Sequence, residues 1–229
     1  MILSKRLSAI ANEVPHYASI ADIGTDHAYL PIYLYKLNKI KKAIATDINK
    51  GPLEKAKNNI MSHQADRIIE TRLGNGLEVL KENEVDTIIL AGMGGMLIID
   101  ILKKRPEIVE NIDRLIIQPQ LDQNEVRKYL HSINHKIINE QLVYEDNKYY
   151  WIMSSEAGKE KYDKEIFYLY SKILIEKKDP ILKQYIEKEI KKNKNILERL
   201  NHPLTEHTLR RKKEIEKNIR DCEEVLLWL

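Results

Sequence analysis

The chain has 229 residues and a mass of 26.9 kDa, with 43% hydrophobic and 32% charged residues. These values are typical of a globular protein with one domain and an added element, and they exclude a disordered chain. Cys222 is the single cysteine, so no internal disulfide can form. No apolar run approaches the roughly 18 residues of a membrane span. We therefore expect a cytoplasmic protein that does not enter a membrane.

The net charge of +3 comes from the C-terminal third of the chain. From Glu156 onward there are 18 basic and 15 acidic residues, whereas 20 of each precede it. So small an excess is usually only the solvated surface of helices. The clusters KKNK at 191–194 and RRKK at 210–213 could also contact phosphate groups.

Short β-branched runs alternate with helical segments from residue 19 to about residue 155, which is typical of a wound α/β sheet. Segments with helical spacing, such as 51–63 and 94–105, separate the first five runs and predict parallel strands joined by crossover helices. The sequence EDNK at 145–148 joins the last two runs and predicts an antiparallel hairpin. The seven runs are 19–24, 42–48, 67–74, 85–92, 113–119, 135–146 and 148–155.

A different pattern follows Gly158, where long charged segments carry apolar residues at helical spacing. Pro180 and NHPLTEH at 201–207 are the expected breaks, and a last helix should begin at about Thr208. We expect an antiparallel helical hairpin or a small coiled coil. The pattern alone leaves open whether this region is a structural appendage or a binding arm.

The loops that follow the first five strands are rich in glycine and polar residues: DIGTDHA, TDINKGP, LGNGLE, AGMGG and QPQLD. Ligands of wound sheets bind beyond the carboxyl ends of the strands, so these loops form the candidate site. Gly24 would let a ligand approach the backbone, and Asp47, 23 positions later, is suitably placed for a ribose diol. The alternatives are a tight turn for Gly24 and a helix cap for Asp47.

A glycine turn followed by an acidic residue at this spacing indicates a nucleotide-like ligand. The residues that stand where a dinucleotide-binding motif has glycines indicate which one. Asp26 and Tyr29 occupy the second and third glycine positions of G-x-G-x-x-G, and a carboxylate there would repel a pyrophosphate. S-adenosylmethionine has no pyrophosphate and carries positive charge, so it suits the loop better than NAD. Asn75 could hydrogen-bond the adenine, although a residue between two glycines is often only a turn residue.

The motifs ADIGTDHAYLP, TDINKGPL, GNGLE, AGMGG and IIQPQ, followed by a helical tail, resemble the bacterial tRNA adenine N1-methyltransferases that modify adenine 22. The resemblance covers essentially the whole chain. It implies an α/β class I methyltransferase fold, Rossmann-like with a mostly parallel seven-stranded sheet. It further implies S-adenosyl-L-methionine as donor, tRNA as substrate and no metal, and we expect a monomer.

The same resemblance implies that two regions of the chain have different functions. Residues 1–157 would bind S-adenosylmethionine and catalyse the transfer, and residues 158–229 would be a coiled-coil arm that holds tRNA. The expected cofactor-binding residues are Gly24, Thr25, Asp47, Ile48, Asn75, Gly76, Gly92, Met93 and Gly94. The expected contacts to substrate are His27, Gln118, Pro119, Lys191, Lys192, Lys194, Arg210 and Arg211. The alternatives are that His27 only lines the turn and that Pro119 is only a turn residue after the strand.

Asp26 and Tyr29 are the expected catalytic residues. The Asn/Asp-Pro-Pro-aromatic motif of exocyclic amine methyltransferases is absent after the fourth strand, where AGMGG stands. A ring nitrogen has an in-plane lone pair and can attack the methyl group without losing a proton first, so alignment in a desolvated pocket could provide much of the rate. Asp26 would contact the adenine N6 amine and offset the developing charge, and Tyr29 would stack on the flipped base. The alternatives are a helix cap for Asp26, on a helix beginning near Pro31, and a core position for Tyr29.

Three other functions remain open from the residues alone. They are an NAD-dependent oxidoreductase, a non-catalytic RNA-binding module, and a methyltransferase that acts on another RNA, a protein or a small molecule. The absence of two motif glycines argues against the NAD-dependent oxidoreductase. The helical region argues only mildly against a methyltransferase that acts on a protein or a small molecule.

Overall fold

The structure is a computed structural model that describes residues 1–200 and 206–229. It divides into two compact units, Met1–Lys161 and Tyr162–Leu229, which are described separately below. Most of the predicted break at 201–207 lies outside the described residues.

The first unit is built on a seven-stranded sheet of order β3-β2-β1-β4-β5-β7-β6. The first five strands are parallel, and β7 is antiparallel to both β5 and β6. The predicted mostly parallel α/β sheet and its closing hairpin are confirmed. The strands are Ala18–Ile23 (β1), Ile40–Asp47 (β2), Ile69–Leu73 (β3), Thr87–Met93 (β4), Arg114–Pro119 (β5), His135–Glu145 (β6) and Lys148–Ala157 (β7).

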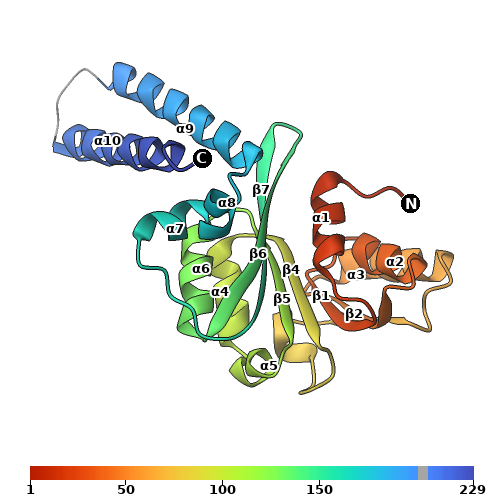
Figure 1. Ribbon diagram of the computed structural model, residues 1–229. Coiled ribbons are helices and arrows are strands. Elements are labelled where there is room, and N and C mark those ends of the chain that lie inside the picture. Colours follow the sequence, from red (N-terminus) through yellow and green to blue (C-terminus); the bar gives the residue numbers. More distant parts are fainter. Residues whose placement is uncertain (201–205) are drawn as a thin grey trace. The chain divides into compact units, whose positions relative to one another are not determined.

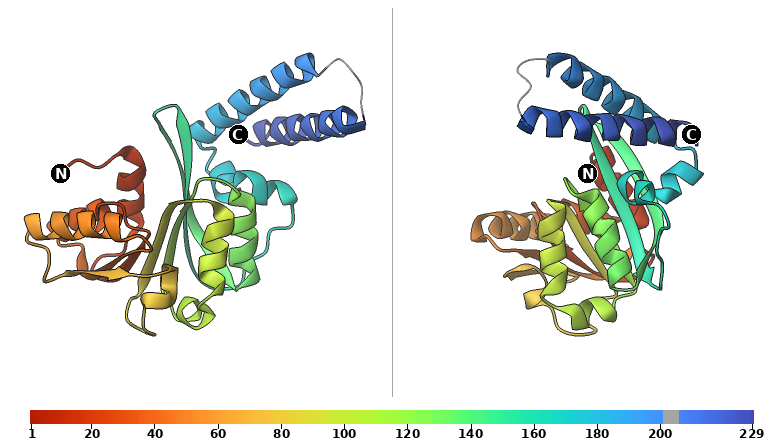
Figure 2. Two further views of the ribbon diagram at one scale, coloured as in Figure 1. Left: turned by 180° about the vertical axis from the view of Figure 1, so that it is seen from behind. Right: turned by 90° about the vertical axis from the view of Figure 1, so that its left-hand side faces the viewer.

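Helices cover both faces of this sheet (Figures 1 and 2). One face carries α1, α2 and α3, where Ile10, Ile32 and Ile60 pack with strand residues in one buried cluster. The other face carries α4 and α6, so the central strands are apolar on both sides, as parallel strands require. The helices are α1 (Lys5–Glu13), α2 (Tyr29–Lys36), α3 (Lys50–Ser62), α4 (Gly95–Lys103), α5 (Pro106–Glu110) and α6 (Gln123–Ser132), with a 3₁₀ turn η1 (Gly76–Val79).

The β6–β7 hairpin closes through Asp146 and Asn147, which have positive φ angles of 49° and 61°. Two consecutive left-handed residues form the tight turn whose twist matches paired strands, and Asp and Asn tolerate that conformation. Because β6 and β5 are both antiparallel to β7, β6 runs in the direction of the parallel strands. The hairpin turn therefore lies at the carboxyl edge of the sheet, beyond the ends of β4 and β5 (Figure 1).

The second unit is helical, with α7 (Glu165–Tyr170), α8 (Lys172–Glu176), α9 (Pro180–Arg199) and α10 (Glu206–Leu226). The Asp179 carboxylate caps α9, and Pro180 occupies its first turn, so the predicted break at this proline is confirmed. The last helix begins two residues before the expected Thr208. In Figure 1, α10 runs back along α9, and Lys194 of α9 pairs with Glu223 of α10 at 3.4 Å. The two helices form a hairpin, and the coiled coil stays a prediction.

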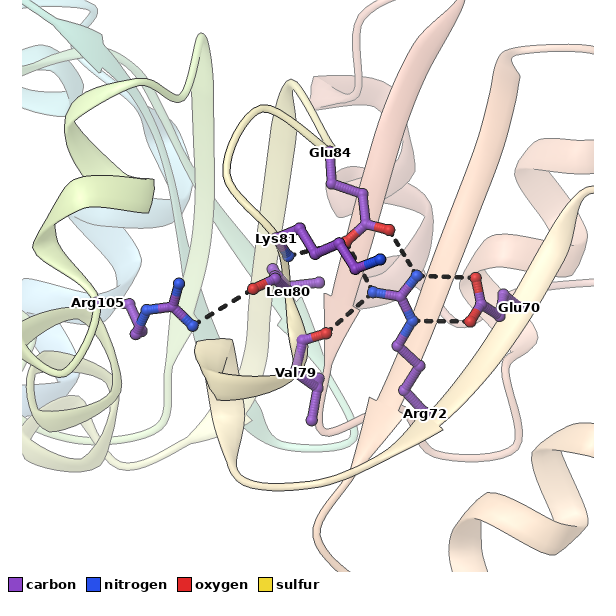
Figure 3. Close-up of polar contacts among 7 residues, drawn as sticks. All are labelled: Glu70, Arg72, Val79, Leu80, Lys81, Glu84 and Arg105. Atoms are coloured by element: carbon purple, nitrogen blue, oxygen red, sulfur yellow. Dashed lines mark hydrogen bonds and ion pairs between the residues drawn. The ribbon is translucent and has the colours of Figure 1, made fainter.

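Arg72 on β3 fixes the connection between β3 and β4 (Figure 3). Its guanidinium donates two hydrogen bonds to Glu84 at 2.6 and 2.7 Å, two to Glu70, and one to the Val79 carbonyl at 2.9 Å. The Arg72 hydrogen bonds lower the pKa of the Glu84 carboxyl to about 2. This cluster holds both ends of the segment that carries η1, and so it determines where the glycines at 74 and 76 lie.

Replacing the Glu84 carboxylate tests this clamp. Glu84→Gln should lower the free energy of unfolding at pH 7 by about 1 to 2 kcal/mol, after allowance for partial solvent screening. The folded-state pKa of Glu84 lies below its ordinary value of 4.5. Its contribution is therefore complete above pH 4.5 and is lost as the pH falls toward 2.

The measurement is urea unfolding of wild type and variant at pH 7, 5 and 3.5, with the exposed Glu82→Gln as matched control. The difference between wild type and Glu84→Gln should shrink at the lowest pH, whereas Glu82→Gln should differ little from wild type throughout. A difference independent of pH would show that the loss is one of packing and that the ion pair contributes nothing.

Candidate active site

A cavity of about 320 Å³ opens at the carboxyl edge of the sheet, where the order of the strands reverses between β1 and β4. Seven of the nine residues predicted to bind a cofactor line it. They come from loops far apart in the sequence, which confirms that the strand ends converge here. These residues are Gly24, Asp47, Ile48, Asn75, Gly76, Gly92 and Met93.

The cavity has an apolar wall on α4 that the sequence reasoning did not assign. Leu97 and Ile101 of α4 line it, beside the predicted Ile48, which is largely exposed. Leu97 and Ile101 are four residues apart and so share one face of the helix. That spacing was visible in the sequence, but it is equally typical of a helix that only packs on a sheet.

A larger cavity of about 520 Å³ lies at the opposite edge, around the end of α6 and the start of β6. None of the predicted site residues lines it. The smaller cavity is the candidate site because the glycine-rich loops meet there.

Three glycines in the cavity wall, Gly24, Gly76 and Gly92, have left-handed backbone conformations. Gly24 has a φ angle of 72°, and a Cβ atom on it would lie 2.2 Å from the Met93 Cε. The space left by the missing side chain is thus filled by Met93 rather than left open to a ligand. Gly92 has a φ angle of 79°, and the nearest atom to a Cβ placed there is Arg6 Nη1 at 3.7 Å. Gly92 therefore exposes its backbone at one end of the cavity.

Asp47 and Asn75 belong to the polar part of the wall, which also includes Thr46 and Asn49. The Asp47 Oδ1 accepts a hydrogen bond from the Asn49 backbone N–H at 2.6 Å, which forms a turn, and Asn49 is itself the N-cap residue of α3. The helix-cap alternative for Asp47 is therefore wrong, although the residue does shape the turn before the helix. Asn75 donates a hydrogen bond from Nδ2 to Glu78 at 3.3 Å.

Thr25 and Gly94 do not line the cavity. The Thr25 side chain is buried, and its hydroxyl donates to Asp22 Oδ2 at 2.6 Å. Burial raises the pKa of Asp22 to about 6, against the lowering effects of this hydrogen bond and of the Arg6 charge. The sequence reasoning missed Asp22, and the available signal was an acidic residue within an apolar strand that leads into the glycine turn.

Asp26, His27 and Tyr29 form a cluster on the turn between β1 and α2. The His27 Nε2 lies 3.2 Å from Asp26 Oδ1, and the His27 and Tyr29 rings stack with centroids 5.2 Å apart and planes 11° apart. His27 and Ala28 both have left-handed φ angles, of 58° and 55°. Such conformations cost free energy in residues other than glycine and concentrate at functional sites. Here the Asn59 side chain supports the turn by donating to the His27 carbonyl at 3.0 Å.

The alternatives for Asp26 and Tyr29 are both wrong. The helix begins at Tyr29, two residues before Pro31, and it has no side-chain cap hydrogen bond, so Asp26 is not a helix cap. The Tyr29 side chain is 41% exposed, so it is not a core residue. The Asp26 side chain is 83% exposed. Both residues are therefore available to a partner molecule.

Gln118 and Pro119 end β5 and are buried. The Gln118 Oε1 accepts hydrogen bonds from Arg6 Nη1 at 3.1 Å and from the Gly92 backbone N–H at 3.2 Å, and its Nε2 donates to the Pro119 carbonyl. Gln118 thus positions the loop after β4. Its predicted contact with substrate, and that of Pro119, stays a prediction.

The predicted RNA-binding cations of the second unit are exposed on α9 and α10. Four of the five lie within ion-pair distance of acidic neighbours: Lys192 with Glu189, Lys194 with Glu223, Arg210 with Glu206 and Arg211 with Glu214. Lys191 has no ion pair within residues 1–200 and 206–229. Much of the positive charge predicted for this surface is therefore balanced locally.

The described part of the chain has neither a cluster of metal ligands nor a membrane-spanning helix. It holds no group of three or more His, Cys, Asp or Glu side chains that could bind a metal ion. None of the described helices has the length and apolar character needed to span a bilayer.

Comparison with known proteins places this chain in a family. Residues 3–153 match the family model described as a methyltransferase domain. The tRNA (adenine(22)-N(1))-methyltransferase of Bacillus subtilis is 41% identical over 156 residues, which cover 68% of this chain and 66% of that protein.

Two solved structures match nearly the whole chain. A Streptococcus pneumoniae protein in complex with S-adenosyl-L-methionine has a TM-score of 0.89 at 33% identity and covers 98% of this chain and 100% of its own. TrmK of M. capricolum in complex with S-adenosyl-homocysteine has a TM-score of 0.87 at 32% identity and covers 100% and 99%. The chain belongs to the methyltransferase-domain family and, within it, to the bacterial tRNA (adenine-22-N1)-methyltransferases.

Proposed function

We propose that this chain transfers a methyl group from S-adenosyl-L-methionine to N1 of adenine 22 in tRNA. The observation that carries the proposal is the adjacency, on one loop, of Gly24 in the cavity wall and the exposed cluster of Asp26, His27 and Tyr29. A donor in the cavity and a base on the cluster would meet at this loop. Because the proposed substrate is tRNA, we expect the protein to act in the cytoplasm. A monomer stays our expectation for its oligomeric state.

The cavity fits S-adenosylmethionine better than a dinucleotide. Its volume of about 320 Å³ falls at the lower end of the range of small-molecule sites. Asp47 presents a carboxylate to the cavity, which suits the two hydroxyls of a ribose, and Ile48 and Leu97 offer apolar surfaces to an adenine. No lysine or arginine is among the described residues that line the cavity, and Arg6 approaches it only at Gly92, so the turn at Gly24 offers no cation to a pyrophosphate.

When bound, S-adenosylmethionine supplies an electrophilic methyl group on a positively charged sulfur. Adenine N1 would attack the methyl carbon with its in-plane lone pair while the carbon–sulfur bond breaks and S-adenosyl-homocysteine leaves, and this step needs no base to remove a proton. The task of the protein is therefore to align and desolvate the two reactants and to stabilise the positive charge that appears on the base.

The exposed cluster suits that task. The Asp26 carboxylate would accept a hydrogen bond from the adenine N6 amine, which becomes a stronger donor as the ring becomes positive. The stacked His27 and Tyr29 rings form a flat surface against which an extruded adenine would stack. The Asp26 carboxylate is largely exposed, so the effect of its charge would increase when bound tRNA excludes water.

Asp47 is expected to hold the donor. Asp47→Ala should weaken binding of S-adenosyl-homocysteine by roughly 10- to 100-fold, because it removes hydrogen bonds to a charged acceptor. Asp47→Asn is the matched variant, since its side-chain oxygen can still accept from Asn49 and keep the turn. Calorimetry should find weaker binding for both variants. Normal affinity of Asp47→Asn would mean that the Asp47 charge is not used by the ligand.

Asp26 is expected to act on the base and not on the donor. Asp26→Ala should reduce turnover at saturating tRNA by roughly 100-fold, in line with the removal of one electrostatic interaction with a developing charge. Affinity for S-adenosyl-homocysteine should be unchanged, because Asp26 does not line the cavity. Asp66→Ala, at another exposed aspartate, is the control. Normal turnover in Asp26→Ala would exclude this role, and an equal loss of donor affinity would move Asp26 to the cofactor site.

The helical unit is expected to bind tRNA phosphates through the cations that lack acidic partners. Replacing Lys191, Lys212 and Lys213 by Gln should weaken tRNA binding and lower the slope of log affinity against log salt by about 0.9 for each duplex phosphate that is no longer neutralised. None of the three has an ion pair within the described residues. The matched variant replaces Lys192, Lys194 and Arg211, which are ion-paired, and should lose less affinity.

Filter binding at several salt concentrations measures both effects, and donor affinity serves as the control for folding. If both triple variants kept the wild-type affinity and slope, the helical unit would have no electrostatic part in tRNA binding.

A further inference from the structure

Arg6 lies at the start of α1, and two contacts with the β6–β7 hairpin hold it there. The Glu145 carboxylate accepts hydrogen bonds from the backbone N–H groups of Lys5, at 2.6 Å, and Arg6, at 3.1 Å. A carboxylate at a helix N-terminus satisfies N–H groups that lack partners within the helix, and it favours the helix dipole. The Arg6 guanidinium also lies over the Tyr150 ring, 5.7 Å from its centroid. The side chain is therefore directed rather than free in solvent.

The Arg6 guanidinium is held against the site. Its Nη1 donates to Gln118 Oε1 at 3.1 Å and lies 3.7 Å from the point where a Cβ atom of Gly92 would be. Gly92 is the backbone that the cavity exposes at this end, and Gln118 also accepts from the Gly92 N–H. Gln118 thus binds the guanidinium and the cavity wall together.

Most N–H donors of the Arg6 guanidinium make no hydrogen bond within the described part of the chain. An arginine side chain has five N–H donors, and the hydrogen bond to Gln118 takes one of them. The other four have no partner in the described part of the chain, and none of the described carboxylates forms an ion pair with this group. A half-buried guanidinium that keeps its donors unpaired beside a ligand cavity is suited to a planar anion.

The sheet also places an anion near the same end of the cavity. Asp22 pairs with Ile89 of β4 and Gln118 pairs with Ala91, and residues two apart on a strand share a face. Asp22, Ala91 and Gln118 therefore lie side by side on the face that α1 covers. The Arg6 charge acts on Asp22 across this row and lowers its pKa against the effect of burial.

We propose that Arg6 binds the α-carboxylate of S-adenosylmethionine, and this rests on the proposed function. If Asp47 of β2 holds the ribose, the amino-acid end of the donor would extend across β1 toward Gly92 of β4. That end is a zwitterion, and a carboxylate is repelled by Asp22 and attracted by Arg6. The two charges thus orient the methionine chain, and through it they fix the position of the sulfur and its methyl group.

A phosphate of the bound tRNA is the other anion that could reach Arg6. Gly92 belongs to the wall of a cavity without other cations, and the guanidinium lies against its backbone. This location favours the donor carboxylate. If it is correct, replacing Arg6 weakens donor binding even when no RNA is present, whereas a phosphate contact would affect only tRNA binding.

The experiment compares S-adenosyl-homocysteine with its decarboxylated analogue, which keeps the amine, by calorimetry on the full chain without tRNA. Wild type should prefer S-adenosyl-homocysteine. Arg6→Ala should lose roughly 10- to 100-fold in affinity for S-adenosyl-homocysteine and keep its affinity for the analogue, so that the preference disappears. Arg6→Lys should restore part of the preference, and Lys5→Ala, at the exposed neighbour, should behave as wild type.

Binding of the analogue also reports folding, because a variant with a displaced α1 would lose both ligands. Equal losses for both ligands, or an unchanged preference, would overturn the proposal. Normal binding of S-adenosyl-homocysteine with weakened tRNA binding would assign Arg6 to a phosphate instead. Failure of the wild-type protein to bind S-adenosyl-homocysteine at all would contradict the proposed function itself, independently of Arg6.

Discussion

The parallel pairing of β1 with β2 on one side and β4 on the other is the constraint on which the site depends. In register, Ile23 at the end of β1 lies beside Thr46 and Leu90, and β2 continues for one residue and β4 for three residues beyond these partners. The loops that follow them must then diverge, because the connections from β1 and β4 lead to helices on opposite faces of the sheet. That divergence opens the cavity, and the residues immediately after each strand become its wall whatever their distance along the chain.

Two sets of polar contacts keep this opening rigid from outside. The Arg72 cluster fixes the connection from β3 to β4 on one side, and Glu145 with Gln118 fixes the start of α1 and the loop after β4 on the other. None of these residues lines the cavity. A site built from loops gains geometric precision when side chains around it have their own hydrogen-bond partners. The strained turn at His27 and Ala28 depends in the same way on Asn59.

The parts of the site that could be predicted are those encoded within one strand and the loop after it. Gly24, Asp47, Asn75 and Gly92 follow apolar runs directly, so a rule about strand ends was enough to bring them together. Arg6 escaped prediction because it reaches the site from a helix that precedes the first strand, through a hydrogen bond to Gln118, which is more than a hundred residues away in sequence. The hydrophobic periodicity of a sequence predicts helices and strands, and it does not predict a hydrogen bond between residues so far apart.

The roles of other residues could not be predicted for a different reason: the same sequence pattern is compatible with two different structural roles. The spacing of Leu97 and Ile101 fits both a packing face and a ligand wall, and in the structure these residues serve the cavity. Clusters of lysine and arginine on the last helices indicated a surface for phosphate, yet ion pairs with neighbouring acids use several of them. Charge composition gives the sum over a surface, and only the arrangement of side chains decides how much of it remains for a partner.

The electrostatic demand of the proposed reaction explains why carboxylates rather than cations surround the reacting centre. Methyl transfer to a ring nitrogen creates no net charge, because the positive charge on the donor sulfur passes to the adenine ring. A site that stabilised the charge only on the donor would bind the reactants well and oppose the transfer. Asp22 is buried and has a raised pKa near the end of the cavity where the donor's amino-acid part is proposed to bind, whereas Asp26 lies on the exposed loop where the base would arrive. Asp22 therefore attracts positive charge on the donor only weakly. The attraction of Asp26 for positive charge on the base would increase when RNA excludes water, and this difference favours transfer of the charge to the base.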